Sequence, residues 1–289
     1  MPITYTPLRF PGGKSKIYPL VDSLIEENHL VGCTYSEAFC GGAGLAAKLL
    51  LKGRVSRIVL NDIDPAVYSA WDAIVNHSDD LCTFISDAPL TVDEWKTQRD
   101  VYQSGKVASL ELGKAAFYLN RTNRSGILSG GVIGGLEQRG AYKMDARFNR
   151  DDLSRKVREI SARADTIELH NLDVHDFMSD VAKKLPESSL LYLDPPYVEK
   201  GPGLYVNSFD EERHRKLCDD VRAYVGKWMV TYDEDDLVTS LYSPCDEWDV
   251  TVSEIEVGYS AATRRTANEM LVLGPSLCLP VGGRIRKAS

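Results

Sequence analysis

Four residues, Asp194-Pro195-Pro196-Tyr197, have the types and order needed to hold an amine for chemistry. They follow the apolar run Leu190–Leu193, which reads as a short buried strand that stops at the prolines. Each proline lacks an N–H and fixes its own φ, so the segment offers a carboxylate and carbonyls, all hydrogen-bond acceptors. An amine on an aromatic ring is a weak nucleophile, and acceptors placed around it would turn its lone pair toward an electrophile. A plain turn is the alternative interpretation, but Tyr197 adds a ring on which a planar base can stack.

A glycine-rich segment, Glu37 to Gly44, leads into the strong helix formers Leu45–Leu51. This order predicts strand, loop and helix, the first unit of a nucleotide-binding α/β fold, although the spacing departs from G-x-G-x-x-G. A second apolar run, Ile58–Leu60, ends in Asn61-Asp62, and a carboxylate at that place commonly binds a ribose diol. Both NAD and S-adenosylmethionine carry such a ribose. The Asp194 segment favours S-adenosylmethionine, because hydride transfer has no obvious use for it.

A third loop, Arg9-Phe10-Pro11-Gly12-Gly13-Lys14, puts a cation beside two glycines near the start of the sequence. The lysine has the charge to neutralise a phosphate or the carboxylate of the cofactor's methionine end. A solvated lysine is the alternative interpretation for this loop taken alone.

Together these segments resemble the alpha-class, Dam-type DNA adenine-N6 methyltransferases, from Phe10 to about Gly274. The matching motifs are Phe10-Pro11-Gly12-Gly13-Lys14, Phe39-Cys40-Gly41-Gly42-Ala43-Gly44, Asn61-Asp62 and Asp194-Pro195-Pro196-Tyr197. Their order leaves room for a target-recognition region between the glycine loop and the Asp194 loop. The sequence departs from the family pattern at Ala38, where proline is frequent.

The resemblance implies a Rossmann-like α/β sheet that binds S-adenosylmethionine, an inserted helical and β-hairpin recognition subdomain, and methylation of a flipped adenine in double-stranded DNA. The implied catalytic residues are Asp194, Pro195, Pro196 and Tyr197. The implied cofactor-binding residues are Phe10, Gly12, Lys14, Phe39, Gly41, Gly44, Asp62, Ile63, Asp176, Phe177 and Asp194. Asp176-Phe177 follows a candidate strand at Thr166–Leu169 and matches a position that cradles the cofactor's adenine.

The region between the two loops is predicted to contact DNA. Residues 66–118 have a mainly helical pattern, and short β-branched runs between glycine pairs over 127–135 suggest a hairpin. Residues 114–150 hold seven Lys or Arg against two acids, although the whole chain carries a net charge of −8. Arg and Asn make bidentate contacts with base edges, which nominates Asn120, Arg121, Asn123, Arg124, Arg139 and Lys143 as DNA-binding residues. The glycine-rich 130–135 stretch differs from the hairpin of GATC-specific members, so the sequence does not predict GATC as the site.

The length of 289 residues suits one catalytic domain with an inserted lobe. We expect residues 1–65 and 160–280 to form the catalytic domain, 66–159 the recognition subdomain and 281–289 a tail. Phe209–Val225 is predicted to be a helix, and Trp228–Tyr232 and Glu269–Leu273 to be core strands. The six cysteines are scattered, which indicates neither a zinc site nor a disulfide framework.

No apolar run is long enough for a membrane span, and no signal-peptide pattern opens the chain. We therefore expect a cytoplasmic monomer of bacterial or phage origin, without a metal, and with a restriction endonuclease as a conceivable partner. Three rival hypotheses stay open: methylation of RNA adenine or protein glutamine, a non-catalytic DNA-binding regulator, and a nicotinamide-dependent oxidoreductase.

Overall fold

The computed structural model describes residues 4–196, 209–246, 248–260, 264–280 and 285–287. Its ten α-helices in these ranges are α1 (Tyr18–Glu27), α2 (Gly44–Leu51), α3 (Pro65–Val75), α4 (Ser78–Asp87), α5 (Val92–Ser104), α6 (Leu110–Thr122), α7 (Arg150–Ser161), α8 (Val174–Asp180), α9 (Glu211–Ala223) and α10 (Asp236–Leu241). The strands are β1 (Thr34–Glu37), β2 (Arg57–Asn61), β3 (Ile167–His170), β4 (Leu190–Leu193), β5 (Lys227–Asp233), β6 (Thr251–Ser260), β7 (Arg264–Leu273) and β8 (Ile285–Lys287).

All of these strands belong to one sheet with the order β3-β2-β1-β4-β5-β7-β6-β8. The first five strands in this order are parallel, and β7 joins β5 in the antiparallel sense. The chain alternates strand and helix through the parallel part, which is the arrangement of an open, Rossmann-like α/β sheet. The predicted α/β fold is confirmed.

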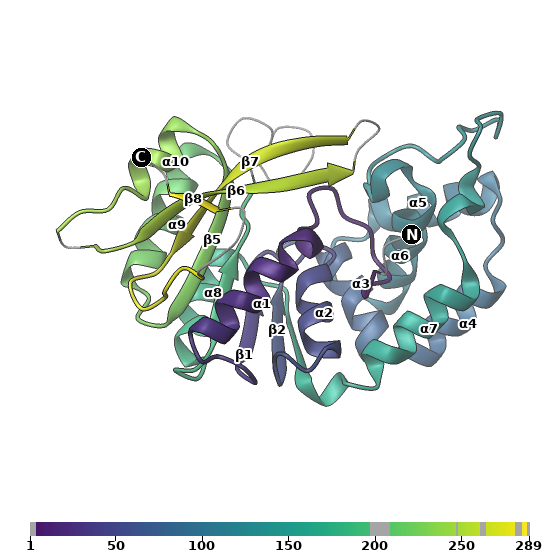
Figure 1. Cartoon of the computed structure of the whole chain (residues 1–289). Coiled ribbons are helices and arrows are strands. Elements are labelled where there is room, and N and C mark those ends of the chain that lie inside the picture. Colours follow the sequence, from purple (N-terminus) through teal and green to yellow (C-terminus); the bar gives the residue numbers. More distant parts are fainter. Residues whose placement is uncertain (1–3, 197–208, 247, 261–263, 281–284, 288–289) are drawn as a thin grey trace.

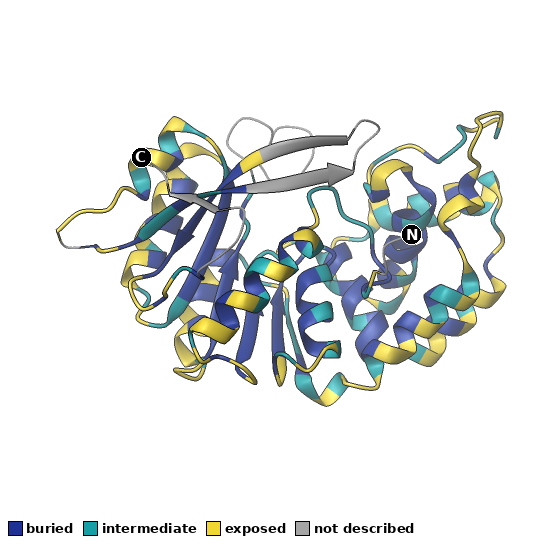
Figure 2. Ribbon diagram, viewed as in Figure 1, coloured by how far each residue is buried: buried dark blue, intermediate teal, exposed yellow. Residues whose placement is uncertain are grey.

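The two faces of the sheet bury two separate hydrophobic clusters, because successive residues of a strand point to opposite faces. Leu190 and Tyr192 of β4 pack with α1, α2 and α3, whereas Leu191 and Leu193 pack with α8 and α9. Strands buried on both faces read as continuous apolar runs, which is why β4 is recognisable in the sequence. In Figure 2 the central strands are dark blue, and the surrounding helices alternate between buried and exposed residues.

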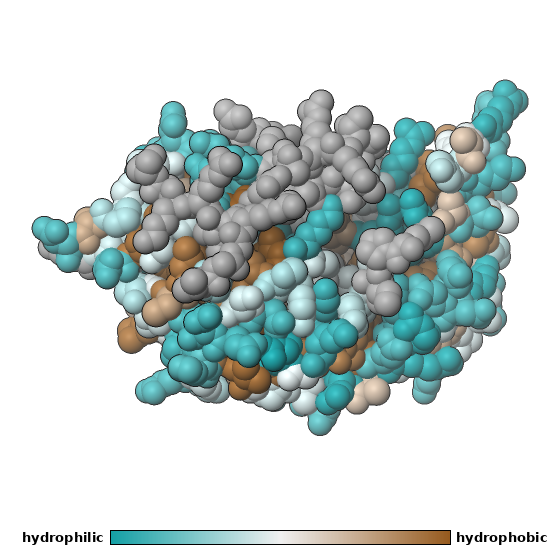
Figure 3. Space-filling view, in the orientation of Figure 1, coloured by the Kyte–Doolittle hydropathy of each residue, from teal (hydrophilic) through white to brown (hydrophobic). Residues whose placement is uncertain are grey.

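The sequence between β2 and β3 forms five helices, α3 to α7, which gather on one side of the molecule beyond α2 (Figure 1). Polar N-caps start four of them: Asp64 before α3, Thr91 before α5, Ser109 before α6 and Asn149 before α7. Their buried side chains belong to the same cluster as those of α1 and α2, so this insert and the sheet share one continuous core. Figure 3 shows mainly hydrophilic side chains over the outer faces of α4 and α7.

Residues 127–135, predicted as a hairpin, form no named strand, and Val132 makes one antiparallel bridge to Asn123, outside this segment. Successive tight turns use its backbone instead: the N–H groups of Ile127, Gly130 and Gly135 each donate to the carbonyl three residues earlier. Positive φ values at Ser125, Gly126, Gly134 and Gly135 bend the chain too sharply for a ladder of paired strands. Residues 285–287, predicted to be part of a tail, pair with β6 as β8.

Among the described residues, no helix is both long enough and apolar enough to pass through a membrane.

Candidate active site

The carboxyl ends of β1, β2, β3 and β4 lie at one edge of the sheet, because these neighbouring strands run in the same direction. One buried side chain, Asn61 at the end of β2, ties the loops together. Its Nδ2 donates to the Ala38 carbonyl at 3.0 Å and to the Leu172 carbonyl at 3.1 Å, while its Oδ1 accepts from the Leu172 N–H. The loops after β1, β2 and β3 are therefore held in a fixed relation to each other.

Asp194 leaves the end of β4 at this edge and is held on one oxygen. The Lys14 Nζ lies 2.8 Å from its Oδ1, and the Thr231 hydroxyl of β5 donates to the same oxygen at 3.0 Å. The Tyr192 hydroxyl is 2.7 Å from the Thr231 hydroxyl. Within the part of the chain that the structure describes, Oδ2 has no comparable partner, and the Asp194 side chain is 24% exposed. Two hydrogen-bonding groups thus hold one carboxylate oxygen, while the side chain stays partly exposed.

Lys14 reaches Asp194 from the loop that the sequence singled out, and it is almost fully buried. Its Nζ also lies 3.4 Å from Glu269 Oε1 of β7. Burial alone lowers the pKa of an ammonium group, but Asp194 and Glu269 outweigh burial and raise the Lys14 pKa above its ordinary value. The lysine is therefore a fixed charge between two carboxylates.

The glycine loop after β1 is shaped by close packing against the amino-terminal loop. The Phe10 ring covers Gly41 and Gly42, so that a Cβ atom at Gly41 would lie 3.0 Å from the ring. Gly41 also has a φ of +45°, and its carbonyl accepts a 2.8 Å hydrogen bond from the Trp71 indole. Glycine is required here by both the backbone conformation and the approach of Phe10.

Phe39, in the same loop, packs edge-on against Phe209, with ring centroids 5.9 Å apart.

Asp62 follows β2 and faces the glycine loop. Its Oδ2 accepts from the Gly41 N–H at 2.9 Å and its Oδ1 from the Asp64 N–H at 3.0 Å. Burial raises the Asp62 pKa to about 6. The Asn171 amide fixes this turn by donating to the carbonyls of Asp62 and of the exposed Ile63. A carboxylate oriented in this way keeps lone pairs that can accept from two neighbouring hydroxyls, which fits a ribose.

Glu37 ends β1 just below the glycine loop and is 5% exposed. Its Oε1 accepts from the Ala46 N–H in the first turn of α2. Burial raises the Glu37 pKa to about 8. Glu37, Glu269 and Thr231 were not among the predicted site residues. The only sequence signal for Glu269 is a carboxylate at the start of an apolar run, a position that strands seldom tolerate without a partner.

The loop after β3 contains a second acid, Asp173, close to the predicted Asp176. Asp173 begins α8 as its N-cap, accepting from the His175 N–H, and forms an ion pair with Arg213. Asp176 lies one turn into the helix and is exposed, and Phe177 is fully buried against His170.

Tyr197 lies outside the described residues. Of the predicted catalytic residues, Asp194, Pro195 and Pro196 are described.

The sequence from residue 10 to residue 257 matches the family model for D12 class N6 adenine-specific DNA methyltransferases. The chain belongs to this family. Comparison with curated protein sequences gives no match.

Two solved structures are similar over most of the chain. The rRNA methyltransferase aviRa from Streptomyces viridochromogenes is 11% identical with a TM-score of 0.40, covering 92% of this chain and 87% of that one. A putative methyltransferase yhhF from Escherichia coli is 9% identical with a TM-score of 0.37, covering 98% and 92%.

The residues that we predicted to bind DNA in this D12-class chain divide into two groups. The Asn120 and Asn123 amides are buried and bonded to the protein itself, and the Arg121 guanidinium donates to the carbonyls of Pro7 and Arg147. Arg124, Arg139 and Lys143 are exposed, and Arg139 pairs with Glu137 at 3.1 Å. We therefore keep the exposed group as candidate DNA contacts and treat the buried group as structural.

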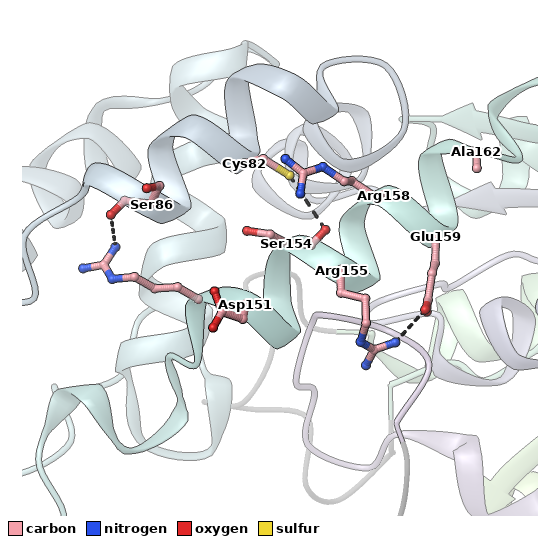
Figure 4. Close-up of a pocket in the computed structure, with 9 residues that line it drawn as sticks. Cys82, Ser86, Asp151, Ser154, Arg155, Arg158, Glu159 and Ala162 are labelled. Atoms are coloured by element: carbon pink, nitrogen blue, oxygen red, sulfur yellow. Dashed lines mark hydrogen bonds and ion pairs between the residues drawn. The ribbon is translucent and has the colours of Figure 1, made fainter.

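A surface hollow between α4 and α7 lies outside the D12-class site (Figure 4). Its walls include Cys82, Ser86, Arg155 and Glu159, and the two charged groups of this set pair with each other. None of its lining residues is among the predicted site residues. A second hollow, at the amino ends of β1 and β2, lies at the opposite end of these strands from Asp194.

Proposed function

We propose that this protein transfers a methyl group from S-adenosylmethionine to the exocyclic N6 amine of adenine in double-stranded DNA, after the base has left the duplex. The observation that carries the proposal is the position of Asp194. It stands at the carboxyl end of β4, beside the glycine loop, with one oxygen fixed by Lys14 and Thr231 and the side chain open to the edge. Membership of the D12 class supplies the substrate class.

The residues at the edge fit S-adenosylmethionine. Asp62 is oriented to accept from ribose hydroxyls, and its Oδ2 is held by the Gly41 N–H of the glycine loop. Phe39 belongs to that loop and packs against Phe209, and the Phe10 ring packs on Gly41 and Gly42. When bound, S-adenosylmethionine supplies an electrophilic methyl group. Phe10, Gly12, Lys14, Phe39, Gly41, Gly44, Asp62, Ile63 and Asp194 are retained as proposed cofactor-binding residues, with Asp173 added beside Asp176 and Phe177.

In this reaction the protein must orient an amine that is a poor nucleophile. Asp194 and the Pro195 carbonyl accept hydrogen bonds from the NH₂ group, which draws the nitrogen toward tetrahedral geometry and aims its lone pair. Lys14 and Thr231 prevent the carboxylate from turning away. Asp194 need not be a strong base, since the methylated amine is acidic enough to lose its proton readily. Such preorganised positioning is a major source of rate enhancement.

Access to the amine requires base flipping, which costs a few kcal/mol of stacking and pairing. In the proposal Tyr197 provides the stacking face, and Arg124, Arg139 and Lys143 contact the duplex. The helices between β2 and β3, residues 66–159, serve as the target-recognition subdomain of a catalytic domain made of 1–65 and 160–280.

The deciding experiment is incubation of the purified protein with S-adenosylmethionine and unmethylated genomic DNA, followed by sequencing of modified adenine at single-base resolution. We expect N6-methyladenine in one short motif. Methylation of an RNA or of a glutamine-containing peptide in parallel reactions, with none on duplex DNA, would overturn the proposal. Absence of methyl transfer to all three would indicate a non-catalytic protein.

Asp194→Ala tests the mechanism within the same assay. We expect it to bind cofactor poorly and to lose activity by roughly 100-fold or more, because the amine is no longer oriented. Asp165→Asn is the matched control, since Asp165 is an exposed carboxylate just before β3, at the opposite edge of the sheet. Near-normal turnover by Asp194→Ala would contradict the mechanism.

A further inference from the structure

Asn120, near the end of α6, lies between the segment that leads to the exposed DNA-contact candidates and the amino-terminal loop. Its Oδ1 accepts from the Arg9 N–H at 2.8 Å, and its Nδ2 donates to the Arg9 carbonyl at 2.6 Å. The same Nδ2 donates to the Gly126 carbonyl at 3.0 Å. One fully buried amide therefore pairs with both backbone groups of Arg9 and with the turn that starts at Arg124.

The turn and the loop also meet directly. Gly126 has a φ of +78°, and a Cβ atom there would collide with the Arg9 carbonyl oxygen and lie 2.9 Å from the Arg9 Cβ. The Arg121 guanidinium adds a hydrogen bond to the Pro7 carbonyl at 3.1 Å. A shift of the turn at Arg124 must therefore shift the backbone at Arg9, because no space separates them.

Arg9 continues immediately into the residues that shape the site. The Phe10 ring packs on Gly41 and Gly42, and the Phe10 carbonyl accepts from the Gly13 N–H. Lys14, at the end of this loop, lies 2.8 Å from Asp194. Close-packed contacts of this kind transmit displacement, since the interior has little free volume to absorb it.

We propose that Asn120 is a positioning residue that couples DNA engagement to the cofactor site. Contact of duplex DNA with the turn at Arg124 fixes Arg9 through the Asn120 amide, and Arg9 in turn fixes Phe10 over the glycine loop. DNA binding and cofactor binding strengthen each other as a result, by the same factor in both directions. This inference rests on the proposed function, because it assigns both ligands to this molecule.

Asn123 provides a matched control three residues away. It is also buried, and its amide makes three hydrogen bonds, to the Trp95 indole and to the carbonyls of Ile127 and Leu128. These bonds hold the same segment of chain but do not touch the amino-terminal loop. Asn123→Ala and Asn120→Ala thus remove equivalent groups, and only one of them cuts the connection to Arg9.

The test is isothermal titration of S-adenosylhomocysteine, the demethylated product that has no methyl group to transfer, with and without a duplex carrying the motif found by sequencing. In the unaltered protein we expect DNA to tighten binding by about 5-fold to 150-fold, the usual range of coupling between sites. In Asn120→Ala we expect the factor to fall below about 2-fold, while Asn123→Ala keeps it. The reciprocal titration, of DNA with and without S-adenosylhomocysteine, must give the same factors.

Retained coupling in Asn120→Ala overturns the inference, as does equal loss in both variants or absence of coupling in the unaltered protein. If Asn120→Ala does not fold, Gly126→Ala decides. It keeps the Asn120 amide but drives the turn against Arg9, so loss of coupling supports the connection and normal coupling refutes it. Failure of the proposed function would be seen separately, since the unaltered protein would then bind neither ligand or methylate no DNA.

Discussion

Single residues at the carboxyl edge owe their properties to burial and to the groups beside them. Lys14 is kept charged by two carboxylates, Asp194 is kept in place by Lys14 and Thr231, and Glu37 is kept protonated by the apolar surroundings of the glycine loop. A neutral acid next to an Asp194 carboxylate limits the negative charge that collects at this edge. The free energy of unfolding should therefore depend on pH through the protonation of Glu37.

Raising the pH should destabilise the fold through Glu37. The folded protein keeps this proton to about pH 8, whereas the unfolded chain releases it near the ordinary value of 4.5. Between these values the folded state binds more protons, so the free energy of unfolding falls as pH rises, by up to about 1.4 kcal/mol per pH unit. Asp62, raised to about 6, acts in the same direction over a narrower range.

Glu37→Gln removes this titration and keeps an oxygen for the Ala46 N–H. Urea unfolding at pH 5 and pH 8 should show a smaller loss of stability in this variant than in the unaltered protein. The exposed Glu187→Gln, which makes the same change of charge, should follow the unaltered protein. An identical pH dependence in all three proteins would contradict the expectation.

Among single residues, those that belong to a short sequence motif could be predicted, but the residues that pair with them in the structure could not. Asp194 and Lys14 were predicted because prolines and glycines mark their loops. Glu269 and Thr231 were not, since they reach the site from strands far along the chain and nothing beside them in the sequence signals a charge to be neutralised. Asn120 and Asn123 were predicted to bind DNA from residue type alone, but both are buried and their amides are hydrogen-bonded within the protein.

Close contacts between particular residues fix the positions of helices and strands, and the packing of α6 against α3 is an example. Gly113 of α6 faces the backbone of α3, where an added Cβ would collide with the Ser69 carbonyl oxygen and lie 3.1 Å from the Ala73 Cβ. This approach sets the position of α6, and with it the position of Asn120. The helix that carries the connection to Arg9 thus depends on a glycine one turn from its start.

Gly113→Ala should destabilise the protein by about 1–3 kcal/mol, even though alanine favours helix, because the overpacked interface must open. Gly131→Ala is the control, since a Cβ atom there meets nothing within 4 Å. Thermal unfolding followed by circular dichroism measures both. A melting temperature for Gly113→Ala equal to or above that of the unaltered protein would show that α3 and α6 separate without cost.

Regular elements were predicted where their periodicity is strong. The strands that became β2, β4, β5 and β7 and the helix that became α9 are confirmed, because buried runs and an amphipathic repeat are local signals. The helices α1 and α7 were not predicted, although Leu153, Val157 and Ile160 of α7 repeat at helical spacing. The hairpin prediction was wrong because glycines with positive φ divert the chain into turns, and backbone angles are not visible in a pattern of residue types.

The whole molecule carries a net charge of −8, so an anionic duplex is repelled by most of its surface. The segment after α6 carries the exposed cations Arg124, Arg139 and Lys143. Under the proposed function we expect DNA to approach from this side, which also presents the turn connected to Asn120. The net charge of the chain and the excess of Lys and Arg over residues 114–150 can be counted in the sequence. Which of these cations are exposed depends on the fold.

Arg124→Ala with Lys143→Ala should reduce the salt dependence of DNA binding. Each lost phosphate contact lowers the slope of log Kd against log salt by about 0.9, so the slope should fall by about 2 if both contact phosphate. Lys183→Ala with Lys184→Ala is the control, because these exposed lysines precede β4 at the opposite edge. Fluorescence anisotropy over a range of salt gives the slopes, and equal slopes for the two double variants would exclude this segment as the DNA contact.

The pairing of β3 with β2 has a consequence for how a new chain folds. These strands are neighbours at the margin of the sheet, yet α3 to α7 are all translated between them. Bringing β2 and β3 together closes a long loop, which costs conformational entropy before their pairing stabilises the chain. We therefore expect the β2–β3 pair to form late in folding. Until then the outer edge of β2 is unpaired, and we expect partly folded chains to be prone to edge-to-edge association through this strand.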